Sequence, residues 1–252
     1  MKLTNLGQCG FVIETGGAKL VTDPYLSYTV DENHYSEATP WVRLYAPPCA
    51  LIDAAPDVVV ISHSHDDHMD PKTLGDYRAA GGDCVIAAPA PECGKLEELG
   101  FSNIVYARAE QAFEAKGFKV TPIICAHTEP HVDDRGSFRE LSYIIEAEGK
   151  KLLFGGDLSI YDGLVERVAR ENIDYALIPA NGRDDERTAN DIIGNTDAAE
   201  AAYLAAAWDW VLVPTHYDLY AINGCPAEEI IAAAEKAGAK ILMPGVGETV
   251  EI

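Results

Sequence analysis

The chain has 252 residues, with 41 Asp and Glu against 19 Lys and Arg and a formal net charge of −22 at pH 7. Proteins bind nucleic acids mainly through Lys and Arg that neutralise phosphates, so this charge argues against a nucleic-acid partner. No apolar run reaches the length of about 18 residues that a membrane helix needs, and we expect no membrane partner. Chains of this length often form one α/β domain, so we predict a single domain over residues 1–252.

The N-terminus, MKLTNLGQCG, has neither the basic start nor the continuous apolar stretch of a secretory signal. The six cysteines are scattered without paired spacing, as reduced core cysteines are. We therefore predict a cytoplasmic protein without disulfides. The cysteines are Cys9, Cys49, Cys84, Cys93, Cys125 and Cys225.

Three short strand-like runs separated by glycines open the chain and predict a β-meander over residues 1–6, 10–14 and 19–22. Asp23 ends the third run, where it is either a carboxylate behind a metal site or a turn residue. Residues 26–56 follow without a clean period and are rich in aromatic side chains. So long an irregular segment predicts a functional loop or lid, although a surface excursion or a homo-oligomer contact fits the aromatic content equally well.

The most informative stretch begins with the uninterrupted β-branched residues 58–61, which predict a strand buried on both faces. The strand ends in a dense group of ligand-type side chains. His63 and His65 share one side of an extended segment, and Asp67 and His68 follow at a turn. Four such side chains within six residues predict a metal site.

Helices and strands alternate after this motif, and the order of a meander followed by αβ units occurs twice. This order predicts two sheets packed face to face with helices outside. We expect helices at 71–80, 92–99, 163–171, 196–207 (with Thr196 as the N-cap) and 227–237, and strands at 84–88, 104–106, 111–114, 118–125, 141–146, 151–154, 175–178, 210–213, 240–243 and 249–252.

Three further strands end at His127, Asp157 and His216. A single histidine in such a place is more often structural than functional. Together with the cluster at residues 63–68, however, the three residues indicate one site at the strand ends.

The cluster at residues 63–68 resembles the first metal motif of the metallo-β-lactamase superfamily. The resemblance implies an α/β fold with four αββα layers, in which two mixed sheets carry the site at one edge. It also implies a ligand set for two divalent ions: His63, His65 and His127 on one, Asp67, His68 and His216 on the other, and Asp157 bridging them.

Two such ions can hold a bridging water and lower its pKa toward about 7. We therefore expect a hydrolase whose nucleophile is a metal-bridging hydroxide, with Asp67 as the catalytic residue that orients it. His65 stands where the oxygen-reducing diiron branch has a carboxylate, which also favours hydrolysis. Imidazole suits zinc, and a mixed set of histidines and carboxylates also accepts manganese.

A second resemblance concerns the segments NGRD at 181–184, IGN at 193–195 and PTHYD at 214–218. They are similar to the branch that contains L-ascorbate 6-phosphate lactonase, which implies a small anionic, phosphorylated lactone or ester as the substrate. The alternative for Asn181 and Arg183 is a solvated loop. The implied substrate-binding residues are Asn181, Arg183, Asn190, Asn195 and Tyr217.

Two other functions remain open. A phosphodiesterase or phospholipase-like metallohydrolase would use the same ligands on a different substrate. A non-catalytic, metal-stabilised assembly protein would use the aromatic segment 28–45 as a contact surface.

Overall fold

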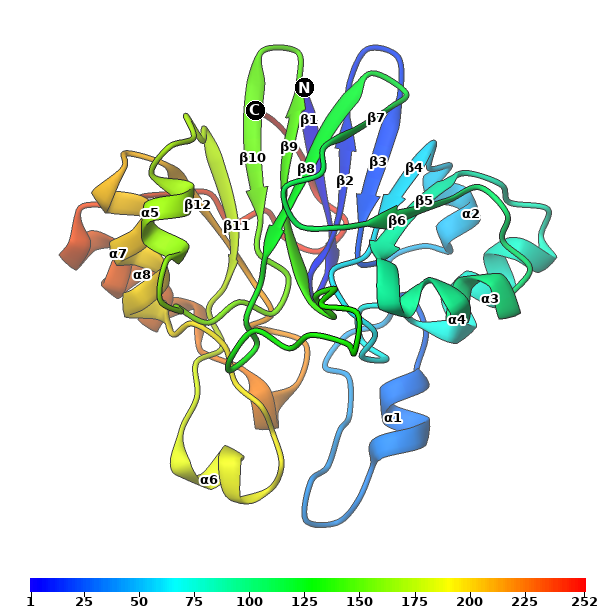
Figure 1. The fold of residues 1–252 in the computed structure, drawn as a ribbon. Coiled ribbons are helices and arrows are strands. Elements are labelled where there is room, and N and C mark those ends of the chain that lie inside the picture. The colour runs from blue at the N-terminus through cyan, green and yellow to red at the C-terminus, as the bar shows by residue number, and fades with distance from the viewer.

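The computed structural model describes residues 1–252 as two seven-stranded mixed sheets packed face to face, with helices on the two outer faces (Figure 1). This confirms the predicted four-layer αββα sandwich. The first sheet contains, in spatial order, β14 (Thr249–Glu251), β1 (Lys2–Gly7), β2 (Gly10–Glu14), β3 (Lys19–Thr22), β4 (Val58–Val60), β5 (Val85–Pro89) and β6 (Ile104–Ala107). The second contains β13 (Lys240–Ile241), β12 (Val211–Thr215), β11 (Tyr175–Pro179), β10 (Lys150–Phe154), β9 (Leu141–Ala147), β8 (Phe118–Ile124) and β7 (Phe113–Ala115).

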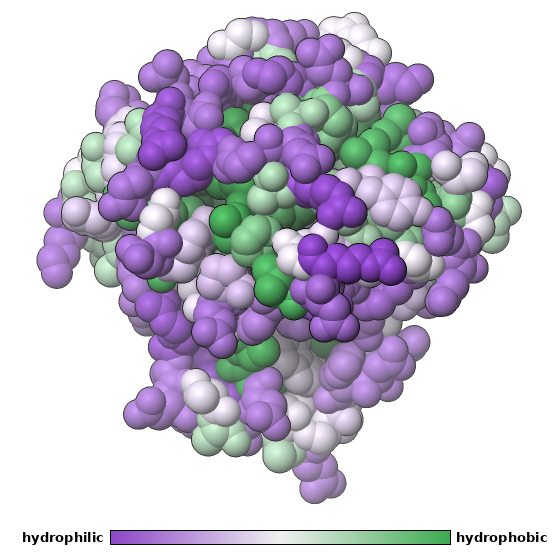
Figure 2. All heavy atoms as spheres, in the orientation of Figure 1, coloured by the Kyte–Doolittle hydropathy of each residue, from purple (hydrophilic) through white to green (hydrophobic).

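The outer helices divide between the sheets (Figure 1). The first sheet is covered by α2 (Leu51–Ala54), α3 (Pro71–Ala79) and α4 (Cys93–Glu98), and the second by α5 (Leu164–Val168), α7 (Ala198–Ala207) and α8 (Ala227–Ala237). None of the helices is long and apolar enough to cross a bilayer, and all six cysteines are free thiols. Most of the face shown in Figure 2 is hydrophilic, in keeping with the strongly acidic composition.

Strand β4 shows why the sequence folds in layers. Val58 and Val60 belong to the buried cluster between the sheets, whereas Val59 belongs to the cluster under the helices. Both faces of the strand are therefore apolar, as its β-branched run predicted. The hydroxyl of Tyr143 on β9 donates to the carbonyl of Ile61 at 2.8 Å and ties the second sheet to the end of β4.

The strand ends fix where a site can form. Strands β3 to β6 are parallel, and β10 to β12 are parallel in the other sheet. Strand β9 is antiparallel to both β8 and β10, so β8 runs in the same direction as β10 and β12. The carboxyl ends of β8, β10 and β12 consequently meet at one edge, where polar residues that follow them come together.

Two long connections extend from this edge, at the bottom of Figure 1. The first, residues 23–57, carries α1 (Thr29–His34) and α2; we call residues 26–45 the first lid. The second, residues 182–195, carries α6 (Asp185–Ala189) and is called the second lid. The sequence predicted neither α1 nor α6, because helices of five or six residues have little intrinsic stability and depend on tertiary contacts.

One predicted helix start is wrong by one residue. The N-cap of α7 is Asp197, whose carboxylate accepts from the Glu200 amide at 2.8 Å while the Glu200 side chain accepts from the Asp197 amide at 3.0 Å. Thr196 was predicted in this role. Its hydroxyl instead donates to the buried carbonyl of Pro179 at 2.6 Å, so it is not free to cap the helix.

Candidate metal centre

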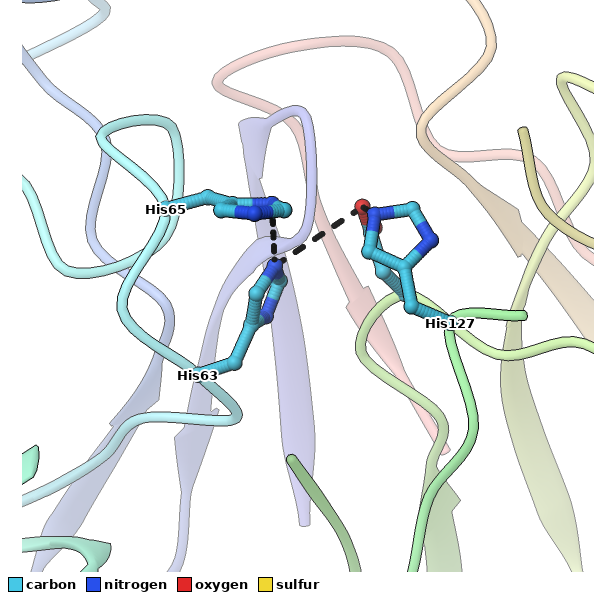
Figure 3. Close-up of side chains that lie close together, drawn as sticks. His63, His65 and His127 are labelled. Carbon is cyan, nitrogen blue, oxygen red and sulfur yellow. Dashed lines mark hydrogen bonds and ion pairs between the residues drawn. The ribbon is translucent and has the colours of Figure 1, made fainter. Parts of the chain in front are cut away.

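The first group of ligand-type side chains comes from both sheets. His63 and His65 follow β4, His127 follows β8 and Asp157 follows β10, and their ligand atoms all lie within 4.8 Å of one another. The three imidazoles point toward one another in Figure 3. Nε2 of His63 lies 2.9 Å from Nδ1 of His65, and Nε2 of His127 lies 3.1 Å from Oδ2 of Asp157.

The second group consists of Asp67, His68 and His216, whose ligand atoms also lie within 4.8 Å of one another. Oδ2 of Asp67 lies 3.1 Å from Nε2 of His216 and 3.4 Å from Nε2 of His68. The structure thus brings together all seven side chains that the superfamily resemblance implied as ligands of two ions.

Asp157 lies between the groups and turns one oxygen toward each. Its Oδ2 faces His127, while its Oδ1 lies 3.1 Å from Nε2 of His68 and 3.4 Å from Nε2 of His216. This is the arrangement that a bridging carboxylate requires.

Two atoms show that a cation fits here. Nε2 of His68 and Oδ1 of Asp157 are buried and lie 3.1 Å apart, but neither atom makes a hydrogen bond of acceptable geometry. Unsatisfied buried polar atoms are costly, and buried charges are normally paired or bound to metals. A cation between these atoms would satisfy both, so the residues present fit a metal ion.

The electrostatics agree with this fit. Burial, with help from the nearby charge of His68, lowers the pKa of His63 well below its usual range, which keeps this imidazole neutral as a metal ligand must be. Burial alone would lower the pKa of His68, but the carboxylates of Asp157, Asp67 and Asp23 raise it well above its usual value. The carboxylates therefore hold a proton on His68 at a place where a metal ion would supply the positive charge instead.

Asp23 lies directly behind this histidine. Its Oδ2 is 2.6 Å from Nδ1 of His68, and its Oδ1 accepts from the Ser62 amide at 2.7 Å. The residue is fully buried, so the carboxylate fixes the imidazole with Nε2 turned toward Asp157. Of the two readings of Asp23, this position favours the carboxylate that orients a metal ligand.

Gln8 is a site residue that the sequence analysis missed. Its Nε2 lies 2.7 Å from Oδ2 of Asp67 and 2.8 Å from Nε2 of His216. Gln8 and His216 both have left-handed backbones, with φ of 55° and 58°, and the His216 amide donates to the Gln8 carbonyl at 3.0 Å. Such backbones cost on the order of 1–3 kcal/mol per residue and persist where the surroundings enforce them. Two glycines around the turn were the only signal in the sequence.

Cys9 was missed as well, although its sulfur lies within 4.8 Å of ligand atoms of His68 and Asp157. Burial raises the pKa of the Cys9 thiol well above its usual value, and the thiol donates to Oγ1 of Thr215 at 3.7 Å. Cys9 therefore packs beside the second group, on the side of His68 and Asp157.

A cavity of about 350 Å³ opens onto the two groups. The first lid contributes Val30, His34 and Trp41 to its wall, and the second lid contributes Asp191, Ile192 and Ile193. The irregular segment 26–56 therefore forms part of the wall of the candidate site.

None of the five predicted substrate-binding residues lines this cavity. Asn181 and Asn195 are buried behind it, where Nδ2 of Asn195 donates to Oδ1 of Asn181 at 3.2 Å and Nδ2 of Asn181 donates to Oδ1 of Asn223 at 2.9 Å. Asn223, which the sequence analysis missed, does line the cavity.

The other three predicted residues do not line it either. Both terminal nitrogens of Arg183 contact the Glu200 carboxylate at 2.6 Å, and the residue borders a separate cavity. Asn190 is exposed at the end of α6 and donates to the carbonyl of Glu186 at 2.8 Å. Tyr217 is half-buried, and burial raises its pKa to about 12.

The NGRD and IGN segments instead pack against each other. A Cβ atom at Gly194 would lie 2.3 Å from the carbonyl oxygen of Gly182 and 2.4 Å from Cβ of Arg183. Only glycine fits there, so both segments build the base of the second lid.

Comparison with known proteins agrees with this architecture. Residues 2–216 match the family described as "Beta-lactamase superfamily domain". A relative from Pelotomaculum thermopropionicum, described as a UPF0173 metal-dependent hydrolase, is 29% identical over an alignment of 258 positions that covers 97% of this chain and 98% of the relative.

Two solved structures share the fold. The metallo-hydrolase Igni18 of Ignicoccus hospitalis has a TM-score of 0.73 at 24% identity and covers 99% of this chain and 97% of its own. An isothiocyanate hydrolase from Delia radicum gut bacteria has a TM-score of 0.78 at 20% identity, and the match covers 100% of this chain and 99% of the hydrolase. With most of its length matched and its ligand-type residues gathered at the shared edge of two sheets, the chain belongs to the β-lactamase superfamily.

Proposed function

We propose that the protein is a hydrolase that depends on two divalent metal ions. The observation that carries this proposal is Asp157, which turns one carboxylate oxygen toward each of two groups of histidines. The match to the superfamily and the metal-dependent hydrolases among the relatives support it.

Two divalent ions in such a site polarise a carbonyl or phosphoryl oxygen and lower the pKa of a water to about 7. His63, His65 and His127 would hold one ion, and Asp67, His68 and His216 the other. The donor set contains no thiolate, and we propose manganese or zinc as the metal.

The chain itself supplies orientation and charge. Burial alone would raise the pKa of Asp67. The charges of His68 and His216 and the hydrogen bonds to them outweigh this effect and hold the pKa of Asp67 well below its usual range. An ionised Asp67 on the cavity wall can accept a hydrogen bond from an attacking water and fix its direction.

For the substrate we propose a small lactone or ester, following the resemblance to the lactonase branch. The predicted contact between Arg183 and a phosphate has no support in the geometry, because that guanidinium is paired with Glu200. A phosphodiesterase is the second candidate, since the same ligands would serve a phosphoryl group equally well.

The test is metal content and turnover measured on one preparation. We expect about two first-row divalent ions per chain and hydrolysis of small lactones or aryl esters that stops when a chelator removes the ions. Faster turnover of bis-aryl phosphodiesters than of any ester would favour the second candidate. A protein that binds no metal would contradict the proposal. A protein that binds two ions but hydrolyses neither esters nor phosphodiesters would also contradict it and would favour the non-catalytic, metal-stabilised assembly protein.

A further inference from the structure

The cavity wall contains no Lys or Arg. It carries four carboxylates, of which Asp67 and Asp157 belong to the metal groups, while Asp66 and Asp191 do not. His34 also lines the cavity, but its Nε2 lies 3.0 Å from Oδ2 of Asp66, so any positive charge on it is already matched. Away from the metal groups, the wall therefore offers no cation that would hold an anion, and its remaining polar side chains, Ser64 and Asn223, are neutral.

The three arginines of the two lids are committed elsewhere, and Arg183 is paired with Glu200 as described above. Arg43 is buried, with Nη1 donating to the Ser27 carbonyl at 2.6 Å and its guanidinium over the Tyr25 ring. Nη1 of Arg187 donates to the Asn181 carbonyl at 2.5 Å, and Nη2 donates to the Gly224 carbonyl at 2.7 Å. Moving either side chain into the cavity would leave buried carbonyls unpaired, which is costly.

The apolar part of the wall comes from both lids. Val30 and Trp41 face it from the first lid, and Ile192 and Ile193 face it from the second. Trp41 is held by an edge-to-face contact with Tyr220, whose ring centroid lies 5.1 Å away. These four side chains offer an apolar surface beside the metal groups.

We propose that this cavity selects substrates whose non-reacting part is uncharged and apolar, and discriminates against those that carry a carboxylate or phosphate there. The inference rests on the proposed function, because the metal ions are taken to bind the reacting end. The remote end then meets Trp41 and the isoleucines of the second lid. An anion at that end would lose its hydration without gaining a cationic partner and would be repelled by Asp66 and Asp191.

Binding of two hydroxamates to the metal-loaded protein tests this without turnover. Butyrohydroxamate and succinate monohydroxamate carry the same metal-binding group and differ only in a terminal methyl or carboxylate. We expect calorimetry to give a dissociation constant about tenfold or more lower for butyrohydroxamate. Equal affinity, or tighter binding of the succinate compound, would overturn the inference and leave the proposed function standing.

A matched pair of variants locates the effect. Ile193 and Ile231 are 45% and 42% exposed, but only Ile193 lines the cavity, while Ile231 lies on α8. Ile193→Arg should shift the ratio of the two dissociation constants toward succinate monohydroxamate by about tenfold. Ile231→Arg adds the same charge and should leave the ratio unchanged.

The remaining outcomes are also decisive. An equal shift in both variants, or no shift in Ile193→Arg, would show that the cavity does not set the preference and would overturn the inference. If the protein holds two ions and binds neither hydroxamate, the cavity is not the substrate site, and the inference fails. If the protein holds no ions, the proposed function is contradicted, and the inference that rests on it falls with it.

Discussion

Removing the carboxylate of Asp157 should weaken both metal sites at once. Its oxygens lie 3.1 Å from Nε2 of His127 and 3.1 Å from Nε2 of His68, so each group loses its shared negative ligand in Asp157→Ala. Taking away one partner of a buried charge pair costs about 3–5 kcal/mol. At about 1.4 kcal/mol per factor of ten, at least one ion should bind more than a hundredfold more weakly.

The assay is elemental analysis after dialysis, followed by a calorimetric metal titration. Asp157→Ala should retain at most one tightly bound ion and almost no turnover. It should stay folded in circular dichroism, because the residue follows the end of β10 and lies outside the apolar clusters.

Asp66→Asn provides the control. Asp66 also lies on the cavity wall but belongs to neither ligand group, so this variant should keep both ions. Two tightly bound ions with wild-type affinity in Asp157→Ala would refute the bridging assignment.

Other predictions concern the surroundings of the site. Chelation should abolish turnover, and added manganese or zinc should restore it; activity that persists without metal would rule out the mechanism. Asp23→Asn should weaken metal binding about 10- to 100-fold by freeing the imidazole of His68, and unchanged affinity in a titration would contradict its orienting role. Arg183→Ala should lower kcat/KM equally for charged and neutral esters and destabilise the fold by about 1 kcal/mol or less, whereas a loss confined to anionic substrates would restore its predicted role. The hydrogen bond to Arg183 lowers the pKa of Glu200, so the ion pair stabilises the fold at neutral pH and this stabilisation is lost as the pH falls below about 4.5. In Glu200→Gln, the free energy of unfolding should therefore lack this decrease between neutral and acid pH.

The seven candidate ligands were predictable because each signal was local. A strand buried on both faces ends at the cluster that begins with His63, and His127, Asp157 and His216 each follow a strand. Strands that run in one direction end at one edge of a sheet, which favours a single site for these side chains. Their division between two ions was implied by the resemblance to the metallo-β-lactamase superfamily.

The rest of the site depends on contacts that no local pattern encodes. Gln8 reaches Asp67 across 59 positions and His216 across 208. Arg183 was predicted to bind an anion because its segment resembles a lactonase motif. In the structure its guanidinium is paired with Glu200, 17 positions away, which closes the capping box of α7 with Asp197. The charge of a side chain can be read from the sequence, but its partner cannot.

The lids show the same limit. The sequence marked residues 26–56 as irregular and aromatic, and Trp41 does reach the cavity wall. It gave no indication that the second lid would meet the first there with Ile192 and Ile193, because this meeting depends on how two long connections leave the same edge.

Anomalous diffraction from crystals grown with manganese or zinc tests the central claim most directly. Two peaks about 3.5–4 Å apart are expected, with Asp157 between them. One peak should contact His63, His65 and His127, and the other should contact Asp67, His68 and His216. A single ion, or ions bound away from these side chains, would contradict the two-metal account.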